Sequence, residues 1–315
     1  MLKKVLKLAC AGICAALALA GCGDSDSGDA VENGRIAVYS GLPPIGFLAA
    51  RVGADRIESH CVLPEGRSPH DYSPGPHDIR GAASSRLFFT TGMNFENALV
   101  RPLASGKIRI VDVTQGVHRI PFDGAGCTDP AHHHDEPGGG HGHEGDDGLD
   151  PHVWLSMENA AVIAANICAA LCEADPAHAD EYRRNLAALQ KELAETDGYV
   201  KKELAPWSGR EFFVYHPAFG YFARMSGLRQ VAVELGGREA TPRHLADVIR
   251  RARETGVRVV FVQPQFNPTS SRALADALGG EVAGLDPLAH DLTGNVRGMA
   301  DALKRGFQRE AAKQE

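Results

Sequence analysis

The sequence lacks the local motifs that mark many enzymes and ATP-driven proteins. It contains no HExxH and no GxSxG motif, which are signatures of zinc proteases and serine hydrolases. It contains no P-loop and no series of membrane spans, so ATP hydrolysis and membrane passage would have to come from other chains. It contains no CxxC pair, which excludes a zinc finger built on neighbouring ligands.

Positive charge is also scarce. The chain has 33 Lys and Arg against 40 Asp and Glu, a net charge of −7. Removing residues 1–21, which hold three lysines and no acid, makes the net charge −10. No stripe of basic residues occurs, and a net negative charge does not suit binding to nucleic acid. We therefore expect no nucleic acid as a partner. The acidic balance suits a protein that handles cations, and about 290 remaining residues are enough for two compact domains.

The first 21 residues have the pattern of a secretion signal. Lys3, Lys4 and Lys7 form a basic start, and an apolar run follows from Leu6 to Ala20. That run is too short and too rich in small residues to span a membrane comfortably, although an uncleaved anchor helix is the alternative. We therefore predict a signal peptide over residues 1–21, outside the folded protein.

The end of this signal resembles a bacterial lipobox. Leu-Ala-Gly-Cys occupies Leu19 to Cys22, and the resemblance implies that Cys22 is lipidated and becomes the new N-terminus. The following polar residues, rich in Gly, Ser and Asp, predict a flexible tether over residues 22–34. A lipid on Cys22 would hold the protein at a membrane surface, in the periplasm or on the cell surface.

Four cysteines remain once the signal and the lipid site are set aside: Cys61, Cys127, Cys168 and Cys172. An oxidising exterior permits disulfides, and four cysteines allow three pairings that the sequence does not distinguish. Cys168 and Cys172 lie one helical turn apart, and they are equally well explained as a pair of small buried residues.

Short apolar runs alternate with helical patterns along the chain, which predicts an α/β protein with parallel sheets and flanking helices. The runs that predict strands are 35–41, 58–64, 86–92, 108–113, 210–216, 229–235, 257–263 and 281–286. They fall into two groups of four. We predict an N-terminal lobe over residues 35–175 and a C-terminal lobe over residues 206–315, each a mainly parallel sheet.

One long helix is predicted between the two lobes, over residues 176–205. Tyr182, Leu186, Leu189 and Leu193 recur there at steps of three and four residues. Thirty helical residues would span roughly 45 Å, more than the radius of a domain. We expect this helix to be the single rigid connector of the lobes.

The segment 122–148 interrupts the alternation. It is rich in Gly, Asp and His and almost free of large apolar residues, so it cannot bury a core and is expected to be a surface loop. Its histidines are His132, His133, His134, His141 and His143. They predict auxiliary low-affinity metal capture. Sensing of metal sufficiency and incidental metal binding are the alternatives.

Three other histidines lie in loops stiffened by proline. His70 follows a predicted strand in SPHDYSPGP, His152 precedes a helix in LDPHVWLS, and His216 ends a strand in VYHPAF. Ligand sites of α/β sheets lie beyond the carboxyl ends of strands. One such histidine is usually structural, but three in similar settings favour a shared metal site.

Asp286, in AGLDPL, also follows a strand and precedes a proline. Three imidazoles and one carboxylate form a set that Zn²⁺ accepts with tetrahedral geometry. The four residues are far apart in sequence, so the site can form only by folding, between the lobes. A water molecule or Glu65 is the alternative fourth ligand.

The motifs GRSPHDYSPGP, DPHVWLS, VYHPAFGYFA and AGLDPL, in this order and with the lipobox and the long helix, resemble the metal-binding solute-binding proteins of bacterial ABC importers. The zinc-specific branch is the most similar. The resemblance covers essentially the whole mature chain. It implies two α/β lobes with a metal in the cleft, and its ligand positions fall on His70, His152, His216 and Asp286. Manganese-type relatives commonly carry a carboxylate where His216 stands, and Mn²⁺ prefers oxygen ligands.

The predicted function is therefore capture of Zn²⁺ outside the cytoplasmic membrane and its delivery to an ABC permease with a cytoplasmic ATPase. We expect a lipid-anchored monomer that is not an enzyme and carries Zn²⁺ as its transported ligand. The alternatives are an adhesin-like protein or a Mn²⁺/Fe²⁺ receptor of the same fold, and a secreted zinc hydrolase with Asp286 as its base.

Overall fold

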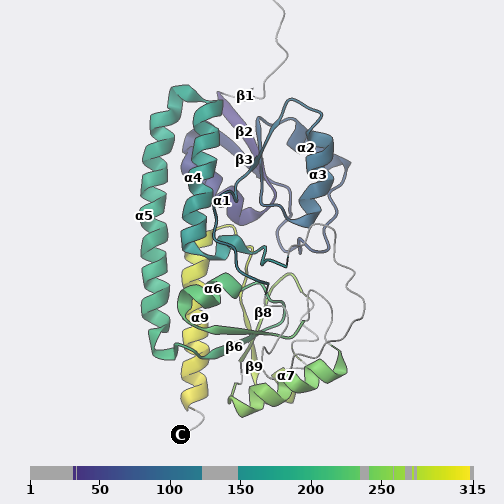
Figure 1. Cartoon of the computed structure of the whole chain (residues 1–315), viewed down its shortest axis with the longest axis vertical. Coiled ribbons are helices and arrows are strands. Elements are labelled where there is room, and N and C mark those ends of the chain that lie inside the picture. Colours follow the sequence, from purple (N-terminus) through teal and green to yellow (C-terminus); the bar gives the residue numbers. More distant parts are fainter. Residues whose placement is uncertain are drawn as a thin grey trace, which may run out of the picture.

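A computed structural model describes residues 31–32, 34–122, 148–234, 241–257, 259–266, 272 and 275–312. The predicted signal peptide, Cys22, Cys127 and the five histidines of the 122–148 segment lie outside these residues. The described chain forms two sheets with flanking helices and one long helix beside both (Figure 1), which confirms the predicted two-lobe α/β fold.

The N-terminal sheet has four parallel strands in the order β3-β2-β4-β5. These are β2 (Arg35–Ser40), β3 (Ile57–Cys61), β4 (Leu87–Thr90) and β5 (Arg109–Asp112). A two-residue strand, β1 (Val31–Glu32), pairs antiparallel with the start of β2, inside the segment predicted as tether. Helices α1 (Pro43–Gly53) and α4 (Met157–Ala174) lie on the side of the long helix, and α2 (Pro76–Ala83) and α3 (Asn97–Leu103) lie on the other side (Figure 1).

The C-terminal sheet is also parallel, in the order β7-β6-β8-β9. Its strands are β6 (Glu211–Val214), β7 (Arg229–Ala232), β8 (Val259–Val262) and β9 (Glu281–Gly284), and its helices are α6 (Gly220–Ser226), α7 (Pro242–Glu254) and α9 (Leu292–Ala312). Successive residues of β6 point to opposite faces. Phe212 and Val214 join the main core, whereas Phe213 packs with Val248 and Ala252 of α7. Both faces are therefore buried, as parallel sheets require.

The long helix α5 covers Ala179–Leu204, preceded and followed by single 3₁₀ turns. Its 26 residues correspond to about 39 Å. It packs against α1 and α4 of the first lobe and against α6 and α9 of the second. Side chains of α9 are hydrogen-bonded to its second half, for example Lys304 to Glu203 at 2.7 Å and Arg297 to Thr196 at 3.0 Å. The predicted long connecting helix is therefore confirmed as α5, and α9 of the second lobe packs against it.

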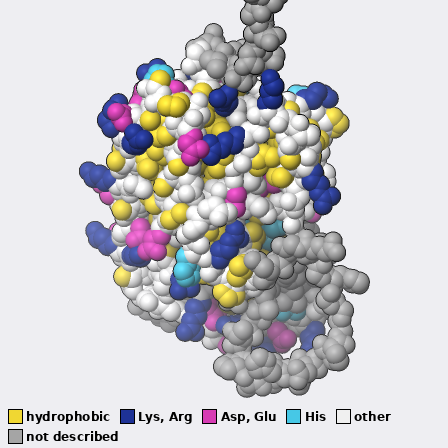
Figure 2. Space-filling model, turned by 45° about the horizontal axis from the view of Figure 1, so that its top comes forward, with side chains coloured by type: hydrophobic (Ala, Val, Ile, Leu, Met, Phe, Trp, Pro, Cys, Tyr) yellow, Lys and Arg dark blue, Asp and Glu magenta, His cyan; other side chains and the backbone are white. Residues whose placement is uncertain are grey.

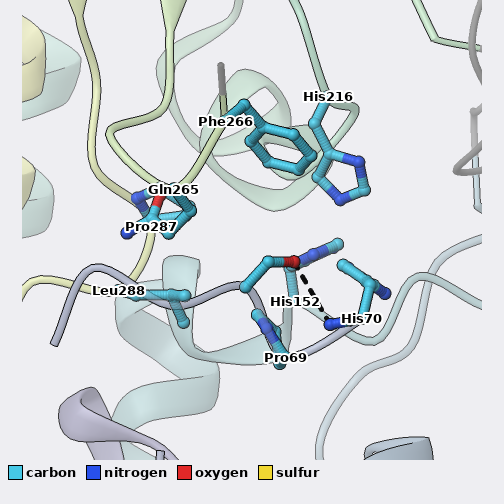
Figure 3. Close-up of a pocket in the computed structure, with 9 residues that line it drawn as sticks. Pro69, His70, His152, His216, Gln265, Phe266, Pro287 and Leu288 are labelled. Carbon is cyan, nitrogen blue, oxygen red and sulfur yellow. Dashed lines mark hydrogen bonds between the residues drawn. The ribbon is translucent and has the colours of Figure 1, made fainter. Parts of the chain in front are cut away.

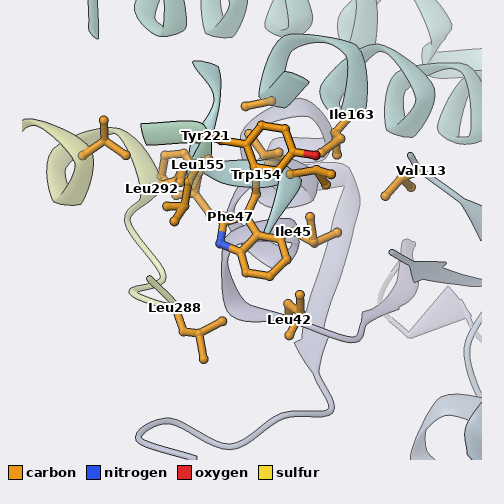
Figure 4. Close-up of a cluster of buried hydrophobic side chains, with 14 of the residues drawn as sticks. Leu42, Ile45, Phe47, Val113, Trp154, Leu155, Ile163, Tyr221, Leu288 and Leu292 are labelled. Carbon is orange, nitrogen blue, oxygen red and sulfur yellow. The ribbon is translucent and has the colours of Figure 1, made fainter. Parts of the chain in front are cut away.

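The hydrophobic core is continuous from one lobe to the other. Figure 4 shows Trp154 and Ile45 of the first lobe in one cluster with Tyr221, Leu288 and Leu292 of the second. The cluster also accounts for α4, the one helix of the described chain that is long and apolar enough to cross a membrane. Half of that apolar window is buried inside the fold, as is typical of a core helix.

The structure also defines two local features of α4. Ser156 caps α4, because its Oγ accepts a hydrogen bond from the Asn159 amide at 3.2 Å. Cys168 and Cys172 are thiols with their sulfur atoms 3.9 Å apart, well beyond the length of a disulfide bond, and Cys61 is also a thiol. On the face shown in Figure 2, basic and acidic side chains are interspersed.

Candidate metal centre

The three predicted histidines meet in one place between the lobes. His70 lies in the loop between β3 and α2, and His152 directly precedes the 3₁₀ turn Val153–Leu155 that leads into α4. His216 lies just beyond the end of β6. Each contributes a ring nitrogen to a group whose atoms all lie within 4.8 Å of one another. Nitrogens bound to one tetrahedral Zn²⁺ would lie about 3.4 Å apart, so small side-chain rotations would close the set on a cation.

A carboxylate fixes the orientation of His152. The Oδ1 atom of Asp150 accepts hydrogen bonds from the His152 backbone amide at 2.9 Å and from the His152 Nδ1 atom at 2.8 Å. Nδ1 therefore carries the proton, and Nε2 presents its lone pair. Both residues are almost fully buried, at 2% and 1% exposed, so the pair is shielded from water. Such a carboxylate behind the ring is the usual support of a metal-binding histidine.

His216 has the same arrangement with a residue of the neighbouring strand's end. Its Nδ1 atom donates to Oε2 of Glu234 at 2.7 Å, and both side chains are buried. Its Nε2 atom is buried and has no hydrogen-bond partner within the described part of the chain. Gln263 fixes the backbone at this point, since its side-chain amide donates to the His216 carbonyl at 2.6 Å. The ring is thus aimed at the pocket with a free lone pair.

Burial favours the neutral form of His70 and of His216. His70 keeps part of its surface in solvent. Its partial burial is the larger cause, and the nearby His216 and His152 rings are the smaller causes, of a pKa lowered to about 3. Burial likewise lowers the pKa of His216, against the opposing hydrogen bond to Glu234. Because only a neutral imidazole binds a metal, the site is prepared for a cation at neutral pH.

The pocket around these rings is small. It is lined by Ser68, Pro69, His70, His152, His216, Gln265, Phe266, Pro287 and Leu288, and its empty volume is about 240 Å³. Phe266 stacks on His216 with ring centroids 5.1 Å apart, as Figure 3 shows. That figure includes space open to solvent, and the part that a water-sized group can occupy is about 10 Å³, room for one small ion and far too little for an organic ligand.

Asp286, the predicted fourth ligand, lies behind the pocket wall and is not part of the group of close ligand atoms. Its Oδ1 atom accepts hydrogen bonds from Nε2 of Gln265 at 2.7 Å and from the Leu288 amide at 2.9 Å. Glu65 is exposed and also does not belong to the group. Gln265 lines the pocket and is hydrogen-bonded to Asp286, so it connects Asp286 to the pocket.

The two ends of the 122–148 segment are joined beside His152. Pro121 and Leu149 form an antiparallel bridge, and the Phe122 amide donates to the Gly148 carbonyl at 2.9 Å. The ring of Phe122 lies 6.3 Å from that of His152, centroid to centroid. Whatever the segment does, its base is anchored next to the metal centre.

Sequence reasoning missed the residues that support the ligands, namely Asp150, Glu234, Gln263 and Gln265. A signal for them was present. Asp150 precedes Pro-His in LDPH, and the other three lie at or just beyond the ends of strands β7 and β8. The rule that located His216 applies equally to these positions.

Comparison with known proteins adds independent evidence. Residues 38–306 match the model of the family described as zinc-uptake complex component A, periplasmic. The high-affinity zinc uptake system protein ZnuA of Yersinia pestis is 30% identical over 266 residues, 80% of this chain and 83% of that protein. The manganese-binding lipoprotein MntA of Halalkalibacterium halodurans is 25% identical over 274 residues, 85% and 84% of the two chains. A crystal structure of ZnuA matches with a TM-score of 0.76 at 28% identity, over 86% of this chain and 99% of that one.

Proposed function

This chain belongs to the zinc-uptake complex component A family, and we propose that its specific cargo is Zn²⁺. The members of this family are metal-binding substrate-binding proteins of ABC importers and are not enzymes. In this proposal the cation is captured outside the cytoplasmic membrane, in the pocket between the lobes. The observation that carries it is the convergence of three ring nitrogens within 4.8 Å, two of them backed by buried carboxylates.

The proposed ligands are His70, His152 and His216, with an oxygen on the side of Asp286 completing the set. Three neutral imidazoles favour a borderline-soft ion, whereas Mn²⁺ prefers a larger share of oxygen ligands. The names of the relatives include both zinc-uptake and manganese-binding proteins, so the choice of metal rests on this donor set. His216 is the position that argues most directly for zinc.

Delivery requires partners. We propose that the loaded protein docks as a monomer on a membrane permease driven by a cytoplasmic ATPase, and that lipidated Cys22 keeps it at the membrane surface. Several relatives are named as lipoproteins of metal ABC transporters, which supports this arrangement. The predicted role of His132, His133, His134, His141 and His143 is auxiliary, raising the local concentration of metal near the pocket.

Calorimetric titration of chelator-stripped residues 23–315 lacking 130–147 tests this function, with Zn²⁺ followed by Mn²⁺. One tight Zn²⁺ site that Mn²⁺ does not displace is expected. His216→Ala should weaken Zn²⁺ binding at least about 100-fold, because it removes a ligand and leaves Glu234 without its partner. His77→Ala is the matched control, since His77 is highly exposed on α2 and outside the pocket. A preference for Mn²⁺, or equal binding by both variants, would contradict the proposal.

A further inference from the structure

We infer that Gln265 is a specificity-determining residue: its Oε1 atom accepts a hydrogen bond from the water shell of the captured cation, and Asp286 acts by orienting Gln265. This inference rests on the proposed function, because it concerns the same cation. The three histidines occupy three sides of the site. On the remaining side, the oxygen that serves the cation then belongs to the neutral amide of Gln265 and not to the carboxylate of Asp286.

The first observation is an unpaired oxygen in the wall of the pocket. Gln265 lines the same cavity as His70, His152 and His216. Its Oε1 atom is buried and has no hydrogen-bond partner among the residues that the structure describes. A buried carbonyl oxygen without a partner destabilises a protein unless a ligand or water satisfies it. Figure 3 shows Gln265 beside Pro287, across the pocket from His70 and His152.

The second observation fixes which end of the amide is left for a ligand. The Leu288 backbone amide can only donate, so Oδ1 of Asp286, which it contacts at 2.9 Å, is an acceptor. The Gln265 atom that approaches the same oxygen at 2.7 Å must then be the NH₂ group. The carbonyl end of Gln265 is therefore the end that remains unpaired. Asp286 determines this orientation without belonging to the group of close ligand atoms.

Gln263, two residues earlier and also beyond the end of β8, has the hydrogen bonds expected of a glutamine with a purely structural role. Its Nε2 atom donates to the His216 carbonyl at 2.6 Å, and its Oε1 atom accepts from the His216 amide at 3.3 Å. Both ends of that amide are satisfied by the protein. Gln265 has only one end satisfied, by Asp286, which is the pattern expected of a side chain that awaits a partner from the pocket.

A neutral oxygen here has a consequence for the choice of metal. The pocket then offers the cation three neutral imidazoles and one neutral acceptor, with the carboxylates of Asp150 and Glu234 behind the rings. A carboxylate at position 265 would add a charged oxygen facing the cation. Harder cations such as Mn²⁺ gain more from such an oxygen than Zn²⁺ does.

The test compares Zn²⁺ and Mn²⁺ binding by the whole mature chain and its variants. Gln265→Ala and Asp286→Ala should each weaken Zn²⁺ binding about tenfold at unchanged stoichiometry, the size expected for one lost hydrogen bond. The double variant should bind no more weakly than the weaker single variant, because Asp286 acts through Gln265. Asp286→Asn, which keeps an acceptor oxygen for Gln265 and Leu288, should recover most of the loss. Gln265→Glu should shift the ratio of affinities toward Mn²⁺ about tenfold.

Gln115→Ala is the matched control. The Gln115 side chain also donates to an aspartate, Asp112, at 2.6 Å, but Gln115 does not line the pocket. The inference is overturned if Gln265→Ala binds Zn²⁺ like the original protein. It is also overturned if Asp286→Ala and Asp286→Asn lose binding alike and additively with Gln265→Ala, since Asp286 would then be a ligand itself. Failure of the proposed function would look different, because the unaltered chain would then lack a tight Zn²⁺ site.

Discussion

At the scale of single residues, buried carboxylates organise this protein. Asp150 and Glu234 each accept the Nδ1 proton of a pocket histidine and so leave Nε2 free for a metal. Asp286 orients an amide, and Glu96 organises a turn after β4. Backbone and ring N–H groups, with a threonine hydroxyl at Glu96, supply the hydrogen bonds that make the buried acids Asp150, Glu234 and Glu96 tolerable.

Glu96 provides a prediction about stability and pH. Its Oε2 atom accepts hydrogen bonds from Thr90 Oγ1 at 2.7 Å and from the amides of Thr91, Gly92 and Met93 at 2.9–3.0 Å. Burial nevertheless raises its pKa from 4.5 to about 7. Between these values the folded state keeps a proton that the unfolded state releases. Its contribution to the free energy of unfolding is thus complete below pH 4.5 and is lost as pH rises through about 7.

The measurement is urea unfolding of the metal-free protein and of Glu96→Gln at pH 5 and pH 8. The stability of the original protein relative to the variant should fall from the lower to the higher pH, by on the order of 3 kcal/mol. Glu195→Gln, at an exposed position of α5, should show no such change. A relative stability that rises with pH would mean that the hydrogen bonds outweigh burial at Glu96.

At the scale of elements, the residues that flank the 122–148 segment, Ile120 and Asp150, connect a helix of the second lobe to the candidate metal centre. The hydroxyl of Tyr221, on α6, accepts a hydrogen bond from the Ile120 amide at 3.2 Å and donates to the Asp150 carbonyl at 3.1 Å. Asp150 in turn orients His152. A helix of the second lobe thereby stabilises His152, a proposed ligand from the first lobe.

Tyr221→Phe should therefore lower both stability and Zn²⁺ affinity. Removing the hydroxyl takes a partner from two buried backbone groups, which costs about 1–3 kcal/mol of unfolding free energy. Loosening Asp150 should weaken Zn²⁺ binding about tenfold. Thermal unfolding and calorimetry measure the two effects. Tyr199→Phe is the control: its hydroxyl donates to Asp301 at 2.7 Å between α5 and α9, so it should affect stability alone. Equal affinities for the two variants would refute the link.

At the scale of the whole molecule, the two lobes are not free to swing apart. The core runs through both lobes, and the indole of Trp154 donates to the Pro287 carbonyl at 2.7 Å across their boundary. Helix α5 runs past both lobes, and α9 lies beside it at the second lobe (Figure 1). Wide hinge closure would expose this core, so binding is expected to proceed through small rocking of the lobes.

Small-angle X-ray scattering checks this expectation. The radius of gyration of the chelator-stripped protein should remain the same within error after Zn²⁺ is added, because the shared core is kept intact. Mg²⁺, which the histidine site disfavours, is the control addition. A clear decrease in the radius of gyration with Zn²⁺ alone would show that the lobes close like a hinge.

Much of this protein was determined by its sequence alone. The strand runs, the long helix and the Ser156 cap follow from local periodicity and capping, which depend on neighbouring residues. His70, His152 and His216 could be selected because proline-stiffened positions beyond strand ends are recognisable in one dimension. Their likeness to a family of metal-binding proteins pointed to the same residues.

Only the tertiary structure decided what surrounds those histidines. Asp150, Glu234, Gln265 and Asp286 act through hydrogen bonds whose partners are set by the packing of strand ends and loops, and local sequence does not specify such distances. The same is true of the packing of α9 against α5 and of the core shared by the lobes. Residue type names the groups that could bind a cation, but folding chooses which carboxylate backs a ring and which oxygen faces the pocket.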